Sequence, residues 1–208
     1  MTARKWFAQD REDKIVARIF RRIHSTNRWA VEIGAMDGEH GSNTAHFRSR
    51  GWTVRLFDQA PLDPMVEQAT ITAENVNAVL ASAGVPRTFD LLSLDIDGND
   101  LWVWKALAFR PRVVVIEYNP LWKPSKSRTV VYDPERFWDG TIYYGASILA
   151  LVRLGKQKGY DLVSSTRSNL IFVRKGLMTP KPAAKVQRPT RIKRPDPLER
   201  PWQVYARG

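Results

Sequence analysis

Acidic side chains stand at the ends of several apolar, strand-like segments of the sequence. The residues concerned are Glu32 and Asp37, Asp58, Asp95 and Asp97, and Glu117 with Asn119. Any one of them alone could be a helix cap or a solvated strand end. In open parallel sheets, however, strand ends converge on one edge, where ligands bind. Like charges gathered there repel each other unless a polar or cationic group lies among them. The pattern therefore predicts a site for a positively charged ligand.

The turn after the first of these segments narrows the choice of ligand. Residues 31–44 read VEIGAMDGEHGSNT, and the spacing from Gly34 to Gly38 is looser than the G-x-G-x-x-G of dinucleotide folds. Acids around the turn, Glu32 among them, disfavour a pyrophosphate and hence a nicotinamide dehydrogenase. Asp58, about twenty residues further on, is placed to hold a ribose diol. The site thus needs a ligand that combines a ribose with positively charged groups. S-adenosylmethionine, which carries a ribose, an ammonium and a sulfonium, meets these requirements.

Alternating strand and helix patterns must position these residues. Strands are predicted over 29–34, 53–58, 68–72, 89–97 and 112–119, helices over 42–50, 73–83, 101–107 and 146–158, and a final antiparallel pair over 160–166 and 168–175. This alternation predicts an α/β fold, with a Rossmann-like, mostly parallel seven-stranded sheet. Because the strands are continuously apolar, helices should cover both faces of the sheet.

Basic segments flank this central domain, residues 27–177. Residues 1–26 contain an amphipathic basic helix, DREDKIVARIFRRI. Residues 178–208 form a proline-rich tail with eight basic and two acidic residues, expected to be disordered or wrapped on the surface. The tail supplies half of the net charge of +12, so nucleic acid is a candidate partner.

Composition excludes several classes of protein. The 208 residues contain no cysteine, which removes thiol nucleophiles and disulfides. No apolar run reaches the ~18 residues of a membrane span, and the N-terminus does not resemble a signal peptide. We therefore expect a cytoplasmic globular protein.

The segments described above, taken in order, resemble those of a known family. VEIGAMDG followed by SNT, then GWTVRLFD, DLLSLDIDGND, VVVIEYN and YYGASILALVRLGKQKGYDLV, resemble class I S-adenosylmethionine-dependent methyltransferases. Within this class, the sequence most resembles the FkbM-type enzymes and their Star-like relatives. The resemblance spans about residues 27–177. The third strand is short for this family, which leaves Glu74 and Asn75 as candidates only for contact with adenine.

The resemblance implies roles for individual residues. Glu32, Gly34 and Gly38 would frame the methionine half of the cofactor, and Ala35 would let the backbone approach it. Asp58 would hold the ribose hydroxyl groups.

Methyl transfer to a hydroxyl group also requires removal of a proton. Asp97 is the candidate catalytic base or orienting group, and Asp95, two residues earlier, should point to the same side. Asp97, Glu117 and Asn119 could instead bind Mg²⁺, although hydrogen bonding without a metal is the favoured interpretation. DIDGND is not a calcium loop, because Ala106 occupies the position of the bidentate glutamate.

Several acceptors remain open. The leading hypothesis is O-methylation of a sugar or another small molecule. Six aromatic and basic side chains of the loop 120–144 could form the acceptor wall: Trp122, Lys123, Arg128, Trp138, Tyr143 and Tyr144. The alternative is methylation of RNA ribose or a base amine. Methylation of cytosine at C5 by the usual route needs a cysteine nucleophile, and the sequence has none. Methylation of a base amine commonly uses an Asp/Asn-Pro-Pro-aromatic loop, and NPLW, Asn119–Trp122, lacks its second proline. A third interpretation is a non-catalytic basic binding module.

Overall fold

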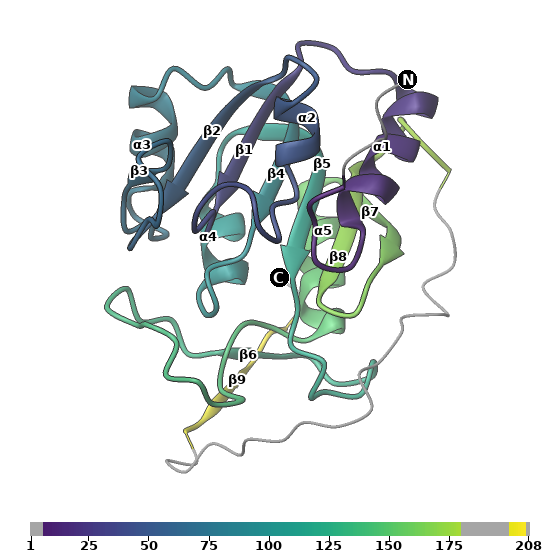
Figure 1. Cartoon of the computed structure of the whole chain (residues 1–208). Coiled ribbons are helices and arrows are strands. Elements are labelled where there is room, and N and C mark those ends of the chain that lie inside the picture. Colours follow the sequence, from purple (N-terminus) through teal and green to yellow (C-terminus); the bar gives the residue numbers. More distant parts are fainter. Residues whose placement is uncertain (1–5, 180–199, 207–208) are drawn as a thin grey trace.

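A seven-stranded sheet forms the centre of the molecule (Figure 1). The computed structural model describes residues 6–179 and 200–206. The strand order is β3-β2-β1-β4-β5-β8-β7, with bounds β1 Trp29–Ile33, β2 Thr53–Asp58, β3 Glu67–Gln68, β4 Thr88–Leu94, β5 Arg110–Glu117, β7 Tyr160–Ser165 and β8 Asn169–Arg174. The first five are parallel; β8 is antiparallel to β5 and to β7. The predicted fold class is confirmed.

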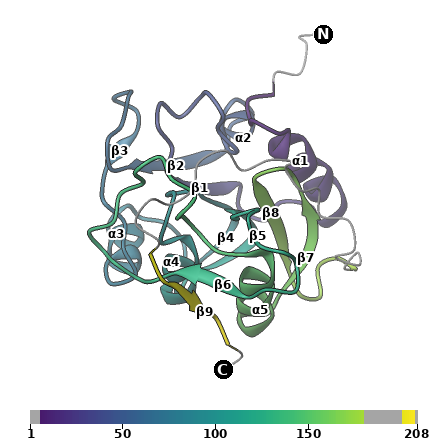
Figure 2. The same cartoon turned by 90° about the horizontal axis from the view of Figure 1, so that it is seen from below.

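Helices cover both faces of the sheet, as the apolar strands require. Side chains of α3 Val76–Ser82, α4 Asp100–Ala106 and α5 Ile148–Lys158 pack in one cluster with alternate residues of β1, β4 and β5. The intervening strand residues pack with α1 Glu12–Ile23 and with Phe47 of α2 Ala45–Arg48 on the other face. Figure 2 shows the two helical layers on either side of the sheet. Burial of both faces excludes water from the strands that carry the acidic ends.

The N-terminal helix α1 is fixed to the sheet by buried polar groups. The Arg112 guanidinium donates to the carbonyl oxygens of Ile23 and His24 and to the Asp90 carboxylate. At the other end of the helix, Asp13 accepts hydrogen bonds from the backbone N–H groups of Phe7 and Ala8. The predicted basic helix is thus an integral layer of the domain.

Several elements are shorter than predicted. The helix expected over 42–50 is reduced to α2, because the Glu32 carboxylate binds residues 42–44 in an irregular turn. The third strand has two residues, and α3 begins at Val76 because Thr72 and Asn75 bind each other's backbone N–H groups. β4 ends at Leu94, which leaves 95–99 free to turn at the sheet edge.

Two further strands cross the carboxyl edge of the sheet. β6 Arg128–Val130 pairs antiparallel with β9 Trp202–Val204; Figure 1 places the pair below the sheet, and Figure 2 shows it on the side of α4 and α5. β9 belongs to the tail that is expected to be disordered or wrapped on the surface, and it pairs with the loop that contains β6. Residues 180–199 and 207–208 of that tail lie outside the described residues. In the described part of the chain, every helix is too short or too polar to span a bilayer.

Candidate functional site

A cavity of about 430 Å³ opens at the carboxyl edge of the parallel strands. Residues at or just after the ends of β1, β2, β3, β4 and β5 line it together with part of the loop after β6. The lining comprises Gln9, Ile33, Gly34, Met36, Asp58, Gln59, Ala69, Thr70, Ile71, Asp95, Ile96, Asp97, Asn99, Glu117, Pro134 and Arg136. Its size falls within the ~300–1,000 Å³ typical of small-molecule sites.

Gly34 allows two strand ends to meet at this cavity. Its φ is +84°, and a Cβ atom built on it would lie 1.6 Å from the carbonyl oxygen of Asp95. The backbone N–H groups of Gly34 and Ala35 both donate to the carbonyl oxygen of Phe57. Any side chain at Gly34 would therefore force β1 and the segment after β4 apart.

Asp58 ends β2 with its carboxylate held in place. Its Oδ2 accepts from the backbone N–H of Met36 at 2.8 Å, and its Oδ1 accepts from that of Ala60 at 2.8 Å. Each carboxylate oxygen retains acceptor capacity after one such bond. Since Asp58 also lines the cavity, it can accept hydrogen bonds from a ligand's hydroxyl groups.

The turn after β4 is built around Asp100. Its carboxylate accepts from the backbone N–H groups of Ile96 at 2.8 Å and Gly98 at 3.0 Å, and burial raises the pKa of Asp100 to about 6. Between these two donors, Asp97 has a φ of +54°, a conformation rare for a residue with a side chain. The turn thus places the Asp97 carboxylate at the cavity.

Three carboxylates converge at this point. Oxygens of Asp95, Asp97 and Glu117 all lie within 4.8 Å of one another, which agrees with the expectation that Asp95 and Asp97 share a side. Burial, and then the charge of neighbouring carboxylates, raises the pKa of Asp95 and of Glu117 well above their ordinary values. Burial and Asp58 likewise raise the pKa of Asp97. A cationic ligand would relieve this repulsion.

Glu117 adds a second indication of a ligand. Its Oε2 atom is buried and has no hydrogen-bond partner within the described residues. An unpaired buried carboxylate oxygen costs free energy unless a donor or a cation reaches it. The atom is therefore a ready acceptor for a positively charged group in the cavity.

One basic side chain, Arg136, also lines the cavity. Arg136 has a side chain 13% exposed, lies 3.9 Å from Asp133 and stacks over the ring of Tyr143 at 4.7 Å. It can bind the carboxylate of an amino-acid ligand. Sequence analysis missed Arg136, and also Gln9, because both reach the cavity from segments without a regular pattern.

Three of the predicted cofactor residues do not line the cavity. Glu32 is buried under the glycine turn, where Ser42, Asn43 and Thr44 donate to its carboxylate. Burial raises its pKa, although these hydrogen bonds oppose the rise. Ala35 packs with Leu56 and Val66, and Gly38 approaches the Leu56 side chain. These residues shape the turn, whereas Gly34, Asp58 and Asp97 reach the cavity.

The proposed metal ligand Asn119 is already bound elsewhere. Its Nδ2 donates to the carbonyl oxygens of Ile142 and Tyr144, and its Oδ1 accepts from the backbone N–H of Leu121. Asp95 stands in its place beside Asp97 and Glu117.

The adenine candidates also serve other contacts. Glu74 accepts from the Tyr132 hydroxyl, and Asn75 binds the backbone at residues 70 and 72. Residues 69–71 line the cavity instead.

No protein-family model and no curated protein matches the chain. Among solved structures, the N-terminal domain of EvdMO1 with SAH bound is similar, with 12% identity and a TM-score of 0.49 over 81% of this chain and 82% of that one. The same domain in the presence of SAH and D-fucose has 12% identity and a TM-score of 0.46 over 80% and 82%. The CMeT domain of citrinin polyketide synthase has 13% identity and a TM-score of 0.36 over 70% and 46%. Because each TM-score is below 0.5, these likenesses do not establish a function for the chain.

Proposed function

We propose that the protein is an S-adenosylmethionine-dependent methyltransferase that methylates a hydroxyl group of a sugar or another small molecule. The observation that carries this proposal is the acidic cavity at the carboxyl edge of a mostly parallel sheet. There Asp58 meets the cluster of Asp95, Asp97 and Glu117.

The residues present fit this cofactor. Asp58, at the end of β2, would accept hydrogen bonds from the ribose hydroxyl groups. The three clustered carboxylates and the unpaired Oε2 of Glu117 favour positive charge, as carried by an ammonium or a sulfonium. Arg136 would bind the cofactor's carboxylate. The same acids would repel the pyrophosphate of a dinucleotide, which disfavours a dehydrogenase.

Asp97 would act on the acceptor. S-adenosylmethionine, when bound, supplies a methyl group on a positively charged sulfur, open to in-line attack by an oxygen nucleophile. The Asp97 carboxylate would orient the acceptor hydroxyl group and take its proton as the new C–O bond replaces the methyl–sulfur bond, with S-adenosylhomocysteine as the leaving group. Burial raises the pKa of Asp97, which makes its carboxylate a stronger base than an exposed one. This chemistry needs no metal, although Asp95, Asp97 and Glu117 could also hold Mg²⁺.

Isothermal titration calorimetry tests the cofactor. We expect binding of S-adenosylmethionine and S-adenosylhomocysteine but not of NAD, and the variant Asp58→Asn should weaken both interactions about tenfold. Loss of one charge-assisted acceptor at the ribose is the physical reason. Binding of NAD alone, or of none of the three ligands, would contradict the proposal. Transfer of a labelled methyl group to a panel of sugars and RNA would then identify the acceptor.

A further inference from the structure

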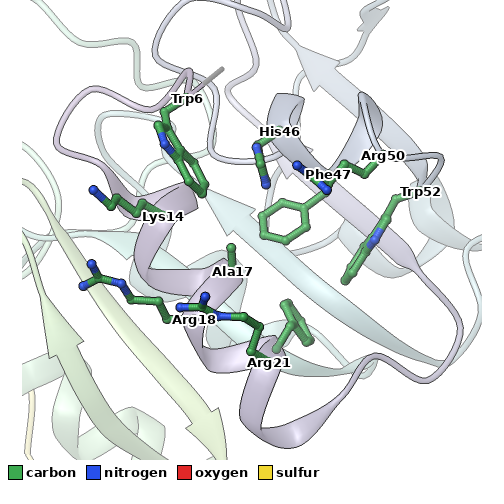
Figure 3. Close-up of a pocket in the computed structure, with 10 residues that line it drawn as sticks. Trp6, Lys14, Ala17, Arg18, Arg21, His46, Phe47, Arg50 and Trp52 are labelled. Carbon is green, nitrogen blue, oxygen red and sulfur yellow. The ribbon is translucent and has the colours of Figure 1, made fainter. Parts of the chain in front are cut away.

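A second cavity, of about 360 Å³, lies between α1 and α2 on the opposite face of the sheet from α3, α4 and α5 (Figure 3). Its lining comprises Trp6, Lys14, Ala17, Arg18, Phe20, Arg21, His46, Phe47, Arg50 and Trp52. It shares no residue with the acidic cavity. The two cavities also have opposite charge.

Aromatic rings form the wall and floor of this second cavity. Trp6 stacks on His46 with ring centroids 4.2 Å apart and an interplanar angle of 22°. Phe20, Phe47 and Trp52 pack against one another at 4.8 to 5.9 Å. Trp6 and Trp52 are half-buried, so part of each ring remains open to a ligand. Flat, partly open rings favour stacking with a planar group.

Cations surround the rings. Lys14, Arg18 and Arg21 follow one another at i, i+4 and i+7 on α1, and Arg50 lies just after α2. Arg18, Arg21 and Arg50 are exposed. Within residues 6–179 and 200–206, none of these four side chains forms a salt bridge, and no acid lines the cavity. Their charge is therefore available to an anionic ligand.

The extent of the charge indicates a polymer rather than a single nucleotide. At a rise of ~1.5 Å per residue, the seven steps from Lys14 to Arg21 spread three positive charges over ~10 Å of helix. A strand with a phosphate at every nucleotide matches such a row, whereas one phosphate would meet only part of it. Stacked rings beside a basic groove are the combination used to bind single strands.

We propose that this basic aromatic cavity binds single-stranded nucleic acid, with one base stacked against Trp6 and the backbone phosphates along α1 and at Arg50. The site is separate from the acidic cavity, and the inference does not rest on methyl transfer.

Fluorescence anisotropy of the full chain with a labelled single-stranded RNA of mixed sequence, without cofactor, tests the proposal. The double variant Arg18→Glu, Arg21→Glu should weaken binding at least tenfold and reduce its salt dependence. Lys156→Glu, Lys175→Glu is the matched control, because it changes the net charge equally at exposed positions on α5 and in the turn after β8. The control should weaken binding no more than about twofold, since both proteins keep the basic tail.

The variant Trp6→Ala separates stacking from charge. It should weaken binding about tenfold while leaving the salt dependence unchanged. Equal losses in the two charge-reversal variants would overturn the proposal, because binding would then follow net charge alone. Full displacement of the RNA by a small excess of AMP would overturn it as well, because a mononucleotide would then suffice. Either failure leaves the titration with S-adenosylmethionine unaffected, so the two proposals can fail separately.

Discussion

At the scale of single residues, Gly34 makes the acidic cavity geometrically possible. The variant Gly34→Ala should lose about 4 kcal/mol or more of unfolding free energy, because its Cβ would overlap the Asp95 carbonyl group. Gly51→Ala is the matched control: it has a similar φ of +79° but open space around the added atom. It should lose only about 1 kcal/mol, the cost of a left-handed backbone. Chemical denaturation measures both, and equal losses would contradict the proposed close approach.

The carboxylates of the cavity predict how cofactor affinity depends on pH. Burial, and then mutual repulsion, raises the pKa of Asp95 and Glu117, and that of Asp97 is also raised. A cationic ligand favours the ionised carboxylates, so its affinity should increase as the pH rises from about 5 to about 8. Calorimetry at successive pH values measures this. A flat or falling affinity would show that the ligand does not bind among these groups.

The raised pKa values of these carboxyl groups predict the opposite pH dependence for the folding stability of the ligand-free protein. A carboxyl group with a raised pKa keeps its proton longer in the folded state than in the unfolded state. Folding stability from these groups is therefore greatest at low pH and decreases as the pH rises above the ordinary carboxyl value of ~4. Ligand affinity and the stability of the free protein should thus change in opposite directions with pH.

At the scale of elements, Arg112 of β5 joins α1 to the sheet: it donates to the carbonyl oxygens of Ile23 and His24 and forms a buried ion pair with Asp90 of β4. Arg112 and Asp90 side chains are 5% and 0% exposed, and Nη1 of Arg112 lies 2.9 Å from Oδ1 of Asp90. Burial alone would raise the pKa of Asp90, but the hydrogen bonds from Arg112 and the backbone N–H groups of residues 26–28 outweigh it and lower the pKa. This part of the stability is therefore present near neutral pH and lost as the pH falls through the lowered pKa.

Removing the Arg112 guanidinium should remove the hydrogen bonds that hold α1 and leave the buried Asp90 carboxylate without its cationic partner. Arg112→Met should cost about 3 to 5 kcal/mol of unfolding free energy. Arg55→Met breaks an ion pair with Glu67 whose side chains are 43% and 49% exposed, and it should cost less than about 1 kcal/mol. Thermal and chemical denaturation compare the two, and similar small losses would show that the buried pair does not anchor the helix.

Local patterns identify most of the elements. The apolar runs of β1, β2, β4 and β5 and the final antiparallel pair follow from residue type alone, as does the C-terminal glycine of α5, Gly159, at φ +83°. The pairing of β6 with β9 joins residues more than 70 positions apart and has no local signal. Loop conformation depends on such distant contacts, which is also why Arg136 was missed.

The position of Glu32 was predictable in part. Val31 and Ile33 belong to the cluster with α3, α4 and α5, while Ala30 packs with α1. Because side chains alternate along a strand, Glu32 must point to the α1 and α2 face, away from the first cluster. Which groups satisfy its carboxylate depends on the return of residues 42–44, and that requires the structure.

At the scale of the whole molecule, the C-terminal segment supports the acidic cavity through successive packing contacts between aromatic side chains and Arg136. Trp202 of β9 packs edge-on against Tyr143 with centroids 4.9 Å apart, and Arg136 stacks over Tyr143. The Tyr143 hydroxyl group also donates to the carbonyl oxygen of Pro201 at 2.7 Å. The end of the chain thus helps to hold the basic side of the cavity.

Truncation of this ring should affect both stability and ligand binding. Trp202→Ala should cost about 2 kcal/mol, lower Tm by about 4 to 8 °C and weaken S-adenosylmethionine binding, because Arg136 loses its support. Val204→Ala, at a residue 56% exposed on the same strand, should cost less than about 0.5 kcal/mol. If the two variants bind the cofactor equally well, β9 does not support the site.

The most direct measurement of the central claim is a crystal structure of the protein soaked with S-adenosylhomocysteine. We expect the ribose hydroxyl groups at the Asp58 carboxylate and the sulfur beside Asp97 and Glu117, within the acidic cavity. A ligand bound at another place, or a ribose turned away from Asp58, would contradict the account.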